Sequence, residues 1–197
     1  SEANLTSLES ATGGALAGGE ETVVLNLEYP NTPSGGEILT VGPASVFSIF
    51  NSVGVPLLDV DGISISLIDL LAPTIDFTDP ENNSTDISTV SNISIAFTEA
   101  VQNSIDAANI TYANATDCFI LEEAVSGEIL AFDIMSSDQI GFEITPDVQL
   151  PELTAIKLSM LSTIEDVNNN GFQFDTLRFL TADESPPQID SRAKSSF

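Results

Sequence analysis

Hydrophobic and polar residues alternate along much of this chain with a period of two. Residues 63–67, 93–97, 140–144 and 156–160 each place an apolar side chain at every second position. Successive side chains of a β-strand point to opposite faces, so this spacing predicts half-buried strands. Turn-forming sequences rich in Gly, Pro, Asn and Asp separate these segments. We therefore expect an all-β protein of short antiparallel strands.

One pattern occurs twice, and its first copy is shorter. Residues 22–27 and 47–56 resemble residues 92–97 and 119–128. The second copy continues through strand-like segments at 154–161 and 173–181, whereas the first passes from residues 63–67 almost directly to Pro73. This predicts a shortened or incomplete β module at 20–71 and a complete β-sandwich at 72–184. An incomplete module has unpaired strand edges, so it must close locally or borrow a strand from another chain.

Both ends of the chain contain segments that could be donated in this way. Residues 1–19 are rich in Gly, Ala and Ser, which indicates a flexible arm or a donated strand. Residues 183–190 repeat the acidic, proline-marked junction at 69–76. Residues 185–197 are therefore expected to be extended, as a donated strand, the start of a further module or an ordinary tail.

Residues 72–182 resemble a known family. The matching segments are 73–75, 93–101, 119–121 with Gly127, 142–146, 150–156, Asp166 with Asn170 and Gly171, and 177–181. In this order they resemble the prokaryotic Ig-like domains that are repeated in surface-layer proteins, adhesins and other secreted proteins. The resemblance implies two Ig-like β-sandwich modules, the first shortened or incomplete, and an extracellular or cell-surface location. The turn at 166–171 departs from the usual pattern of the family.

Composition excludes several classes of function. Acidic residues number 30 and basic residues only 4, giving a net charge of −26. Nucleic acids and anionic membranes are therefore poor partners, because few cationic groups can neutralise phosphates. No stretch reaches the roughly 18 apolar residues of a membrane span.

Catalytic chemistry is also poorly represented. The chain has no His, and with Cys118 as its single cysteine it cannot form an internal disulfide. Acidic pairs such as Glu122–Glu123 would point to opposite faces of a strand, so we expect no enzyme. Cys118 lies in an apolar run, which favours a buried thiol over an interchain disulfide or a reactive thiol.

Two groups of oxygen-bearing residues are candidate calcium ligands, although no cofactor is required. Asp166, Asn168 and Asn170 alternate before Gly171, as in the start of a calcium loop, but residue 177, the twelfth of the loop, is Leu. Asn and Asp also favour ordinary tight turns, so both interpretations stay open. The second group is Asp76, Asp79, Glu81 and Asp86, which either bind a cation or form a solvated acidic loop.

Six asparagines satisfy the N-glycosylation pattern, in which Asn is followed two residues later by Ser or Thr. They are Asn4, Asn82, Asn83, Asn92, Asn109 and Asn114. A sequence rich in Asn and Thr produces some of these by chance. Together they favour an exported glycoprotein.

These features lead to two functional hypotheses. The first is a structural subunit that self-associates into an extracellular filament, pilus-like fibre or surface layer, with donated strands from 1–19 or 186–197 and the module at 20–71 as acceptor. The second is a tandem spacer or adhesive segment of a larger cell-surface protein that binds a glycan or protein ligand.

Overall fold

The computed structural model describes residues 3–43, 45, 50–51, 53–58 and 62–187. The chain divides into two compact units, unit 1 (Ser1–Leu71) and unit 2 (Ala72–Phe197). The described residues form fourteen strands and one helix of four residues, so the prediction of an all-β protein is confirmed. No helix in this described part is long and apolar enough to cross a membrane.

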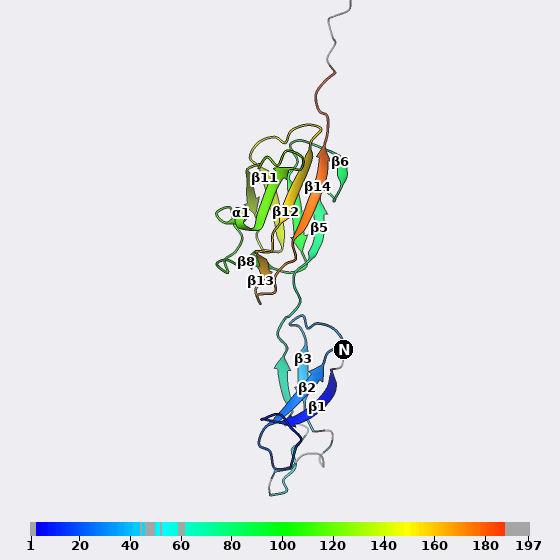
Figure 1. Cartoon of the computed structure of the whole chain (residues 1–197), viewed down its shortest axis with the longest axis vertical. Helices are drawn as coiled ribbons and strands as arrows, with labels where there is room; N and C mark the ends of the chain where they lie inside the picture. The colour runs from blue at the N-terminus through cyan, green and yellow to red at the C-terminus, as the bar shows by residue number, and fades with distance from the viewer. Residues whose placement is uncertain (1–2, 44, 46–49, 52, 59–61, 188–197) are drawn as a thin grey trace, which may run out of the picture. The chain divides into compact units, whose positions relative to one another are not determined.

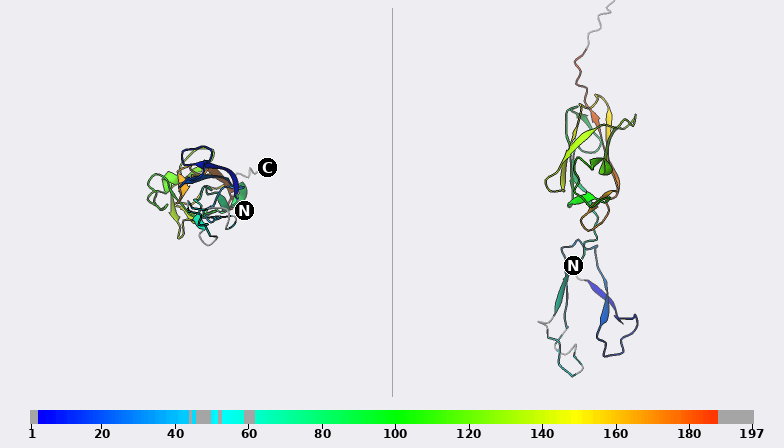
Figure 2. Two further views of the ribbon diagram at one scale, coloured as in Figure 1. Left: turned by 90° about the horizontal axis from the view of Figure 1, so that it is seen from below. Right: turned by 90° about the vertical axis from the view of Figure 1, so that its left-hand side faces the viewer.

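Unit 1 consists of two antiparallel hairpins. Strand β1 (Asn4–Ser10) pairs with β2 (Val23–Glu28), and β3 (Ile38–Val41) pairs with β4 (Ile63–Ser66). Each hairpin is a separate two-stranded sheet, and Figure 2 shows them as two arms of the unit. The strand predicted at 47–56 falls partly outside the described residues; within them, Phe50 and Pro56 form an isolated bridge.

The segment predicted at 1–19 as a flexible arm or donated strand contains a strand in its first half. Residues 4–10 form β1 and pair with β2 of the same chain. Leu5 lies opposite Leu27, and Leu8 lies opposite Leu25, so the pairing brings apolar side chains together. The glycines that suggested flexibility, at 13, 14, 18 and 19, all lie in the connection between the two strands.

Unit 2 is a sandwich of two four-stranded sheets (Figure 1). The first sheet has the order β10 (Phe132–Met135), β11 (Gly141–Pro146), β7 (Ile93–Phe97), β5 (Ile75–Asp79). The second has the order β6 (Ser84–Ile87), β14 (Asp175–Thr181), β12 (Ala155–Met160), β9 (Phe119–Glu123). Pairing is antiparallel except between β14 and β6, which run parallel. A short pair, β8 (Val101–Asn103) with β13 (Ile164–Asp166), and helix α1 (Ala115–Cys118) complete the unit.

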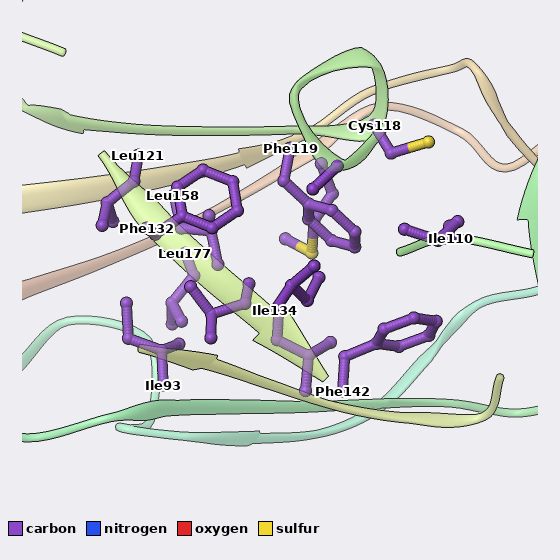
Figure 3. Packing of buried hydrophobic residues seen from close by; sticks show 14 of the residues in the cluster. Ile93, Ile110, Cys118, Phe119, Leu121, Phe132, Ile134, Phe142, Leu158 and Leu177 are labelled. Atoms are coloured by element: carbon purple, nitrogen blue, oxygen red, sulfur yellow. The ribbon is translucent and has the colours of Figure 1, made fainter. Parts of the chain in front are cut away.

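The core lies between the two sheets. Alternate residues of the central strands are buried there, as the period-two pattern predicts: Ile93, Ile95 and Phe97 on β7 are at most 2% exposed. Figure 3 shows such side chains from both sheets pointing toward one another. The ring of Phe97 meets those of Phe142 and Phe172 edge-on, with centroids 5.9 and 5.4 Å away. Unit 2 therefore has the continuous core of a complete domain.

The end of the described chain is fastened to unit 2. The Glu184 carboxylate accepts hydrogen bonds from the hydroxyls of Ser88 (2.7 Å) and Thr89, and the Ser185 hydroxyl donates to Glu152 (2.7 Å). These hydroxyl contacts hold the pKa of the Glu184 carboxyl below its usual value. Of the segment predicted to be donated, residues 188–197 lie outside the described residues.

Candidate functional site

The β3–β4 hairpin of unit 1 has one apolar face, while the other, here called its polar face, carries Thr40, Ser64 and Ser66 together with Ile38. Residues directly opposite each other share a face, so Leu39 with Ile65 and Val41 with Ile63 form an apolar surface. On the other face, the hydroxyls of Thr40 and Ser64 are 3.0 Å apart. Ile63 remains 64% exposed and Ile65 54% exposed. Among the described residues, this apolar face is therefore only partly covered.

The β1–β2 hairpin also has one apolar face. Leu5, Leu8, Val23, Leu25 and Leu27 share one face, by the same pairing rule. Leu25 and Leu27 are half-buried, but Leu5, Leu8 and Val23 are each more than 40% exposed. The sequence pattern within each strand signalled these two-faced hairpins, but it did not show that both apolar faces would stay open.

The described residues of unit 1 form almost no core. Among its described residues, only Pro43 is buried. A two-stranded hairpin is at best marginally stable in water, and three or more strands with a covered apolar face are usually needed. The described part of unit 1 is thus two hairpins whose apolar faces need further cover, and the shortened β module at 20–71 stays a prediction.

The loop after β13 shows what the predicted calcium ligands do in the protein. The carboxylate of Asp166 is completely buried and accepts hydrogen bonds from the backbone N–H groups of Asn168 and Asn170, both at 2.8 Å. It also accepts one from the Asn170 side-chain amide at 2.8 Å. Asn169 adopts a left-handed conformation with φ of 67°, which Asn tolerates better than most residues. Asp166 therefore holds a tight turn in place.

This geometry favours turn chemistry at residues 166–170. A calcium loop needs oxygen atoms that converge on the cation. Here two backbone N–H groups and an amide NH₂ face the carboxylate, and the Asn168 side chain is exposed. Calcium binding at these residues stays a prediction, and it would require Asn170 to present its oxygen instead.

The second group of candidate ligands, the junction carboxylates, is spread over two sheets. It comprises Asp76, Asp79, Glu81 and Asp86, all exposed. Asp76 and Asp79 lie on β5 in one sheet, while Asp86 lies on β6 in the other. Within the described part of the chain, no three junction carboxylates lie close enough together to share one ion. The structure therefore offers no preformed metal site among them.

The six glycosylation candidates differ in how accessible their side-chain nitrogen is. Asn4, Asn82, Asn83 and Asn109 are exposed. The amide of Asn92 donates to Glu143, and half-buried Asn114 donates to the carbonyl of Asn109 at 3.2 Å. A glycan on either of these two would replace a hydrogen bond. Glycosylation at all six sites stays a prediction.

Cys118 ends helix α1 with its side chain in the core. The residue is fully buried, and burial, aided by the negative charges of Asp117 and Asp106, raises the pKa of the thiol to about 11. A thiol that stays protonated and out of contact with water is a poor nucleophile. The arrangement matches the expected buried small hydrophobe.

Comparison with known proteins assigns the family. Residues 69–181 match the family model described as a bacterial Ig-like domain, and this match covers more than half of the chain. The chain therefore belongs to the bacterial Ig-like domain family, and the resemblance expected from its sequence is confirmed. No curated protein sequence matches the chain.

Several solved structures resemble the chain at low sequence identity. Surface layer protein SbsC, domains 1–6, matches with 14% identity and a TM-score of 0.41, over 59% of this chain and 14% of that one. CopC from Methylosinus trichosporium OB3b matches with 7% identity and a TM-score of 0.42, over 59% of this chain and 99% of that one. L,D-transpeptidase 3 from Mycobacterium tuberculosis has 10% identity, a TM-score of 0.35, and coverage of 55% and 37%. At these scores the neighbours carry no information about function.

Proposed function

We propose that the protein is a non-enzymatic structural subunit of an extracellular filament, pilus-like fibre or surface layer, in which neighbouring subunits cover each other's incomplete β modules. The observation that carries this proposal is the pair of partly uncovered apolar faces in unit 1. Ile63 and Ile65 on one hairpin, and Leu5 and Leu8 on the other, belong to regular strands, so they form surfaces rather than scattered exposed residues.

The energetics favour association through these faces. Full burial of a Leu, Ile or Val side chain contributes about 1.5–3 kcal/mol. These side chains are already about half-buried, so covering five or six of them contributes roughly 4–9 kcal/mol per copy. The entropic cost of association is roughly 4–15 kcal/mol, which this gain offsets in large part when both copies contribute. A partner strand that also pairs with a hairpin edge adds backbone hydrogen bonds. Two copies of unit 1 can thus form a core that a single copy lacks.

The charge of the protein sets the conditions for assembly. A net charge of −26 makes copies repel each other, and salt screens that repulsion. We therefore expect assembly to increase with ionic strength. Calcium, if it binds, would act in the same direction.

An extracellular location is part of the proposal. It is supported by the concentration of glycosylation patterns, of which Asn82, Asn83 and Asn109 are exposed on unit 2. It is also consistent with the family, although a fold alone does not define function.

The test is electron microscopy and sedimentation of the whole chain as a function of concentration and salt. Ile65→Asp places a charge on the apolar face of the β3–β4 hairpin, and Ser66→Asp places the same charge on its polar face. We expect the wild type and Ser66→Asp to assemble and Ile65→Asp to remain smaller. Equal behaviour of the two variants would refute the role of the apolar face. A wild type that stays monomeric in all conditions would instead support a spacer or adhesive segment of a larger surface protein.

A further inference from the structure

An apolar groove lies on unit 2 where both sheets of the sandwich end. Strand β9 is the last strand of its sheet, and β10 is the last strand of the other sheet. The groove between them has a volume of about 490 Å³. Buried Phe119, Leu121 and Phe132 contribute to its lining, and exposed Tyr112 and Ile129 stand at its rim. Most of its lining is therefore hydrocarbon, although it is open to solvent.

The edge of β9 beside this groove is only partly paired. Near its end, Leu130 N–H donates to the carbonyl of Leu121 (2.9 Å), and Glu122 forms a bridge with Ile129. Toward Phe119, β12 is the one strand that pairs with β9 in the described part of the chain. At the other end, Phe119 N–H donates to the Ala115 carbonyl of α1, so only a short stretch of this edge between the two contacts is left for a partner strand. A strand that docks there would gain a few backbone hydrogen bonds and, mainly, apolar burial in the groove.

The facing strand β10 is protected from such addition. Its outermost N–H groups include that of Ile134, which donates to the carboxylate of the preceding residue, Asp133, at 2.7 Å. A charged side chain bonded to its own strand edge is a common device against edge pairing. An added strand would therefore pair with β9 and pack its side chains toward β10.

Residues 188–197 have the sequence that this site requires. Ile189, Ala193 and Phe197 alternate with polar residues, and the positions between them on the same face are Ser191 and Ser195. Extended, the segment would have one face of apolar and small side chains and one polar face. It has the spacing of a half-buried strand although it lies outside the described residues.

The charge of the segment complements the groove. Arg192 and Lys194 are two of the four basic residues in the chain, and Asp190 is the single acidic residue among positions 188–197. Asp147 is the one charged residue among the described residues that line the groove. In a protein of net charge −26, this is the segment least repelled by another copy.

The described residues just before the segment favour an extended continuation of the chain. Glu184 and Ser185 are fastened to unit 2, and Pro186 and Pro187 follow immediately. Consecutive prolines favour an extended backbone and cannot donate hydrogen bonds, so a direct return onto the same unit is disfavoured.

We propose that residues 188–197 of one copy add as a strand to the Phe119 end of β9 in a second copy, with their apolar face in the groove. The inference rests on the proposed self-association and names the segment and the site that connect the copies. Such a contact joins two different surfaces, so each copy can bind one neighbour on each side. If the rotation between neighbouring copies does not close a ring, the result is an open filament.

The experiment uses the chain without residues 188–197 and a fluorescent synthetic peptide of that sequence. We expect the peptide to bind the shortened chain with one-to-one stoichiometry, and the shortened chain to form smaller assemblies than the full chain. Ile129→Glu should weaken peptide binding at least about tenfold. Val167→Glu is the matched control, because Val167 is 67% exposed and Ile129 64% exposed, and the added charge is the same.

Four outcomes would overturn the inference. They are no binding at about 1 mM peptide, equal weakening by both substitutions, unchanged binding of a peptide carrying Ala193→Asp, or a full chain that stays monomeric while its shortened form binds the peptide. The last result would mean that residues 188–197 bind the groove of the same copy. Thermal unfolding of both variants confirms that they are folded.

The result also separates this inference from the proposed function. If the shortened chain assembles as well as the full chain and does not bind the peptide, the inference fails and the proposed function stands. If the peptide binds as expected but Ile65→Asp assembles like Ser66→Asp, the inference stands and the role proposed for the apolar face of unit 1 fails.

Discussion

Replacing Asp166 tests whether the loop after β13 is a turn or a calcium site. The Asp166→Asn substitution keeps the size of the side chain and one oxygen, which can still accept from the backbone N–H groups of Asn168 and Asn170. Its new amide nitrogen would face the amide nitrogen of Asn170, which now donates to the carboxylate. In the present orientation of the Asn170 amide, two donors would then face each other at a completely buried residue; turning that amide removes this clash but breaks the arrangement that the carboxylate now holds.

The magnitude follows from these three hydrogen bonds. A buried donor without an acceptor costs about 1–3 kcal/mol. The two backbone hydrogen bonds would also become weaker, because an acceptor with a negative charge forms hydrogen bonds roughly twice as strong as a neutral one. We expect the free energy of unfolding of unit 2 to fall by about 2–4 kcal/mol.

The assay is urea unfolding followed by circular dichroism, in excess EDTA and again in millimolar calcium. If Asp166 supports a turn, the loss is the same in both solutions. The double variant Asp166→Asn with Asn170→Asp exchanges donor and acceptor and should recover part of the stability. A loss below about 0.5 kcal/mol, or one that appears only with calcium, would refute the turn interpretation.

Three further predictions concern other parts of unit 2. Cys118 should not react with a thiol reagent at pH 8 until urea unfolds the protein, because its thiol is buried and has a pKa of about 11; rapid reaction of the native protein would contradict this. Phe97→Ala should lower the free energy of unfolding by about 3–5 kcal/mol, whereas Phe77→Ala, at a side chain that is 54% exposed, should cost well under half of that. In an NMR titration, Glu184 should show a pKa below 4.5, and Thr89→Val should raise that pKa. The lowered value means that this contact contributes stability above pH 4.5, and the contribution is lost as the pH falls through the folded-state pKa.

Local sequence patterns were sufficient for much of the fold of unit 2. Strands β7, β11 and β12 follow period-two alternation in segments where one face is buried, and the same residues that show the alternation form the core. The turn at Asp166 is also local, since its three donors lie within four residues of the carboxylate. The sequence could not decide between turn and metal, because both use the same residue types at the same spacing.

The candidate sites that depend on distant residues were less predictable. The junction carboxylates are close in sequence, but β5 and β6 enter different sheets, so the chain separates Asp76 and Asp79 from Asp86. Likewise, the composition of residues 1–19 suggested an arm, and only the pairing of Leu5 with Leu27 and Leu8 with Leu25 shows a strand. Pairing partners are set by the whole sheet, and a short segment does not contain that information.

The sequence by itself determined the all-β class and the Ig-like family, because alternation, turns and the order of motifs are properties of neighbouring residues. Tertiary structure alone decided which apolar side chains of the described residues stay exposed. The open apolar faces of unit 1 depend on which strands pair and on what fails to cover them. The groove at Phe119 exists because β9 and β10 are consecutive in the chain yet terminate different sheets.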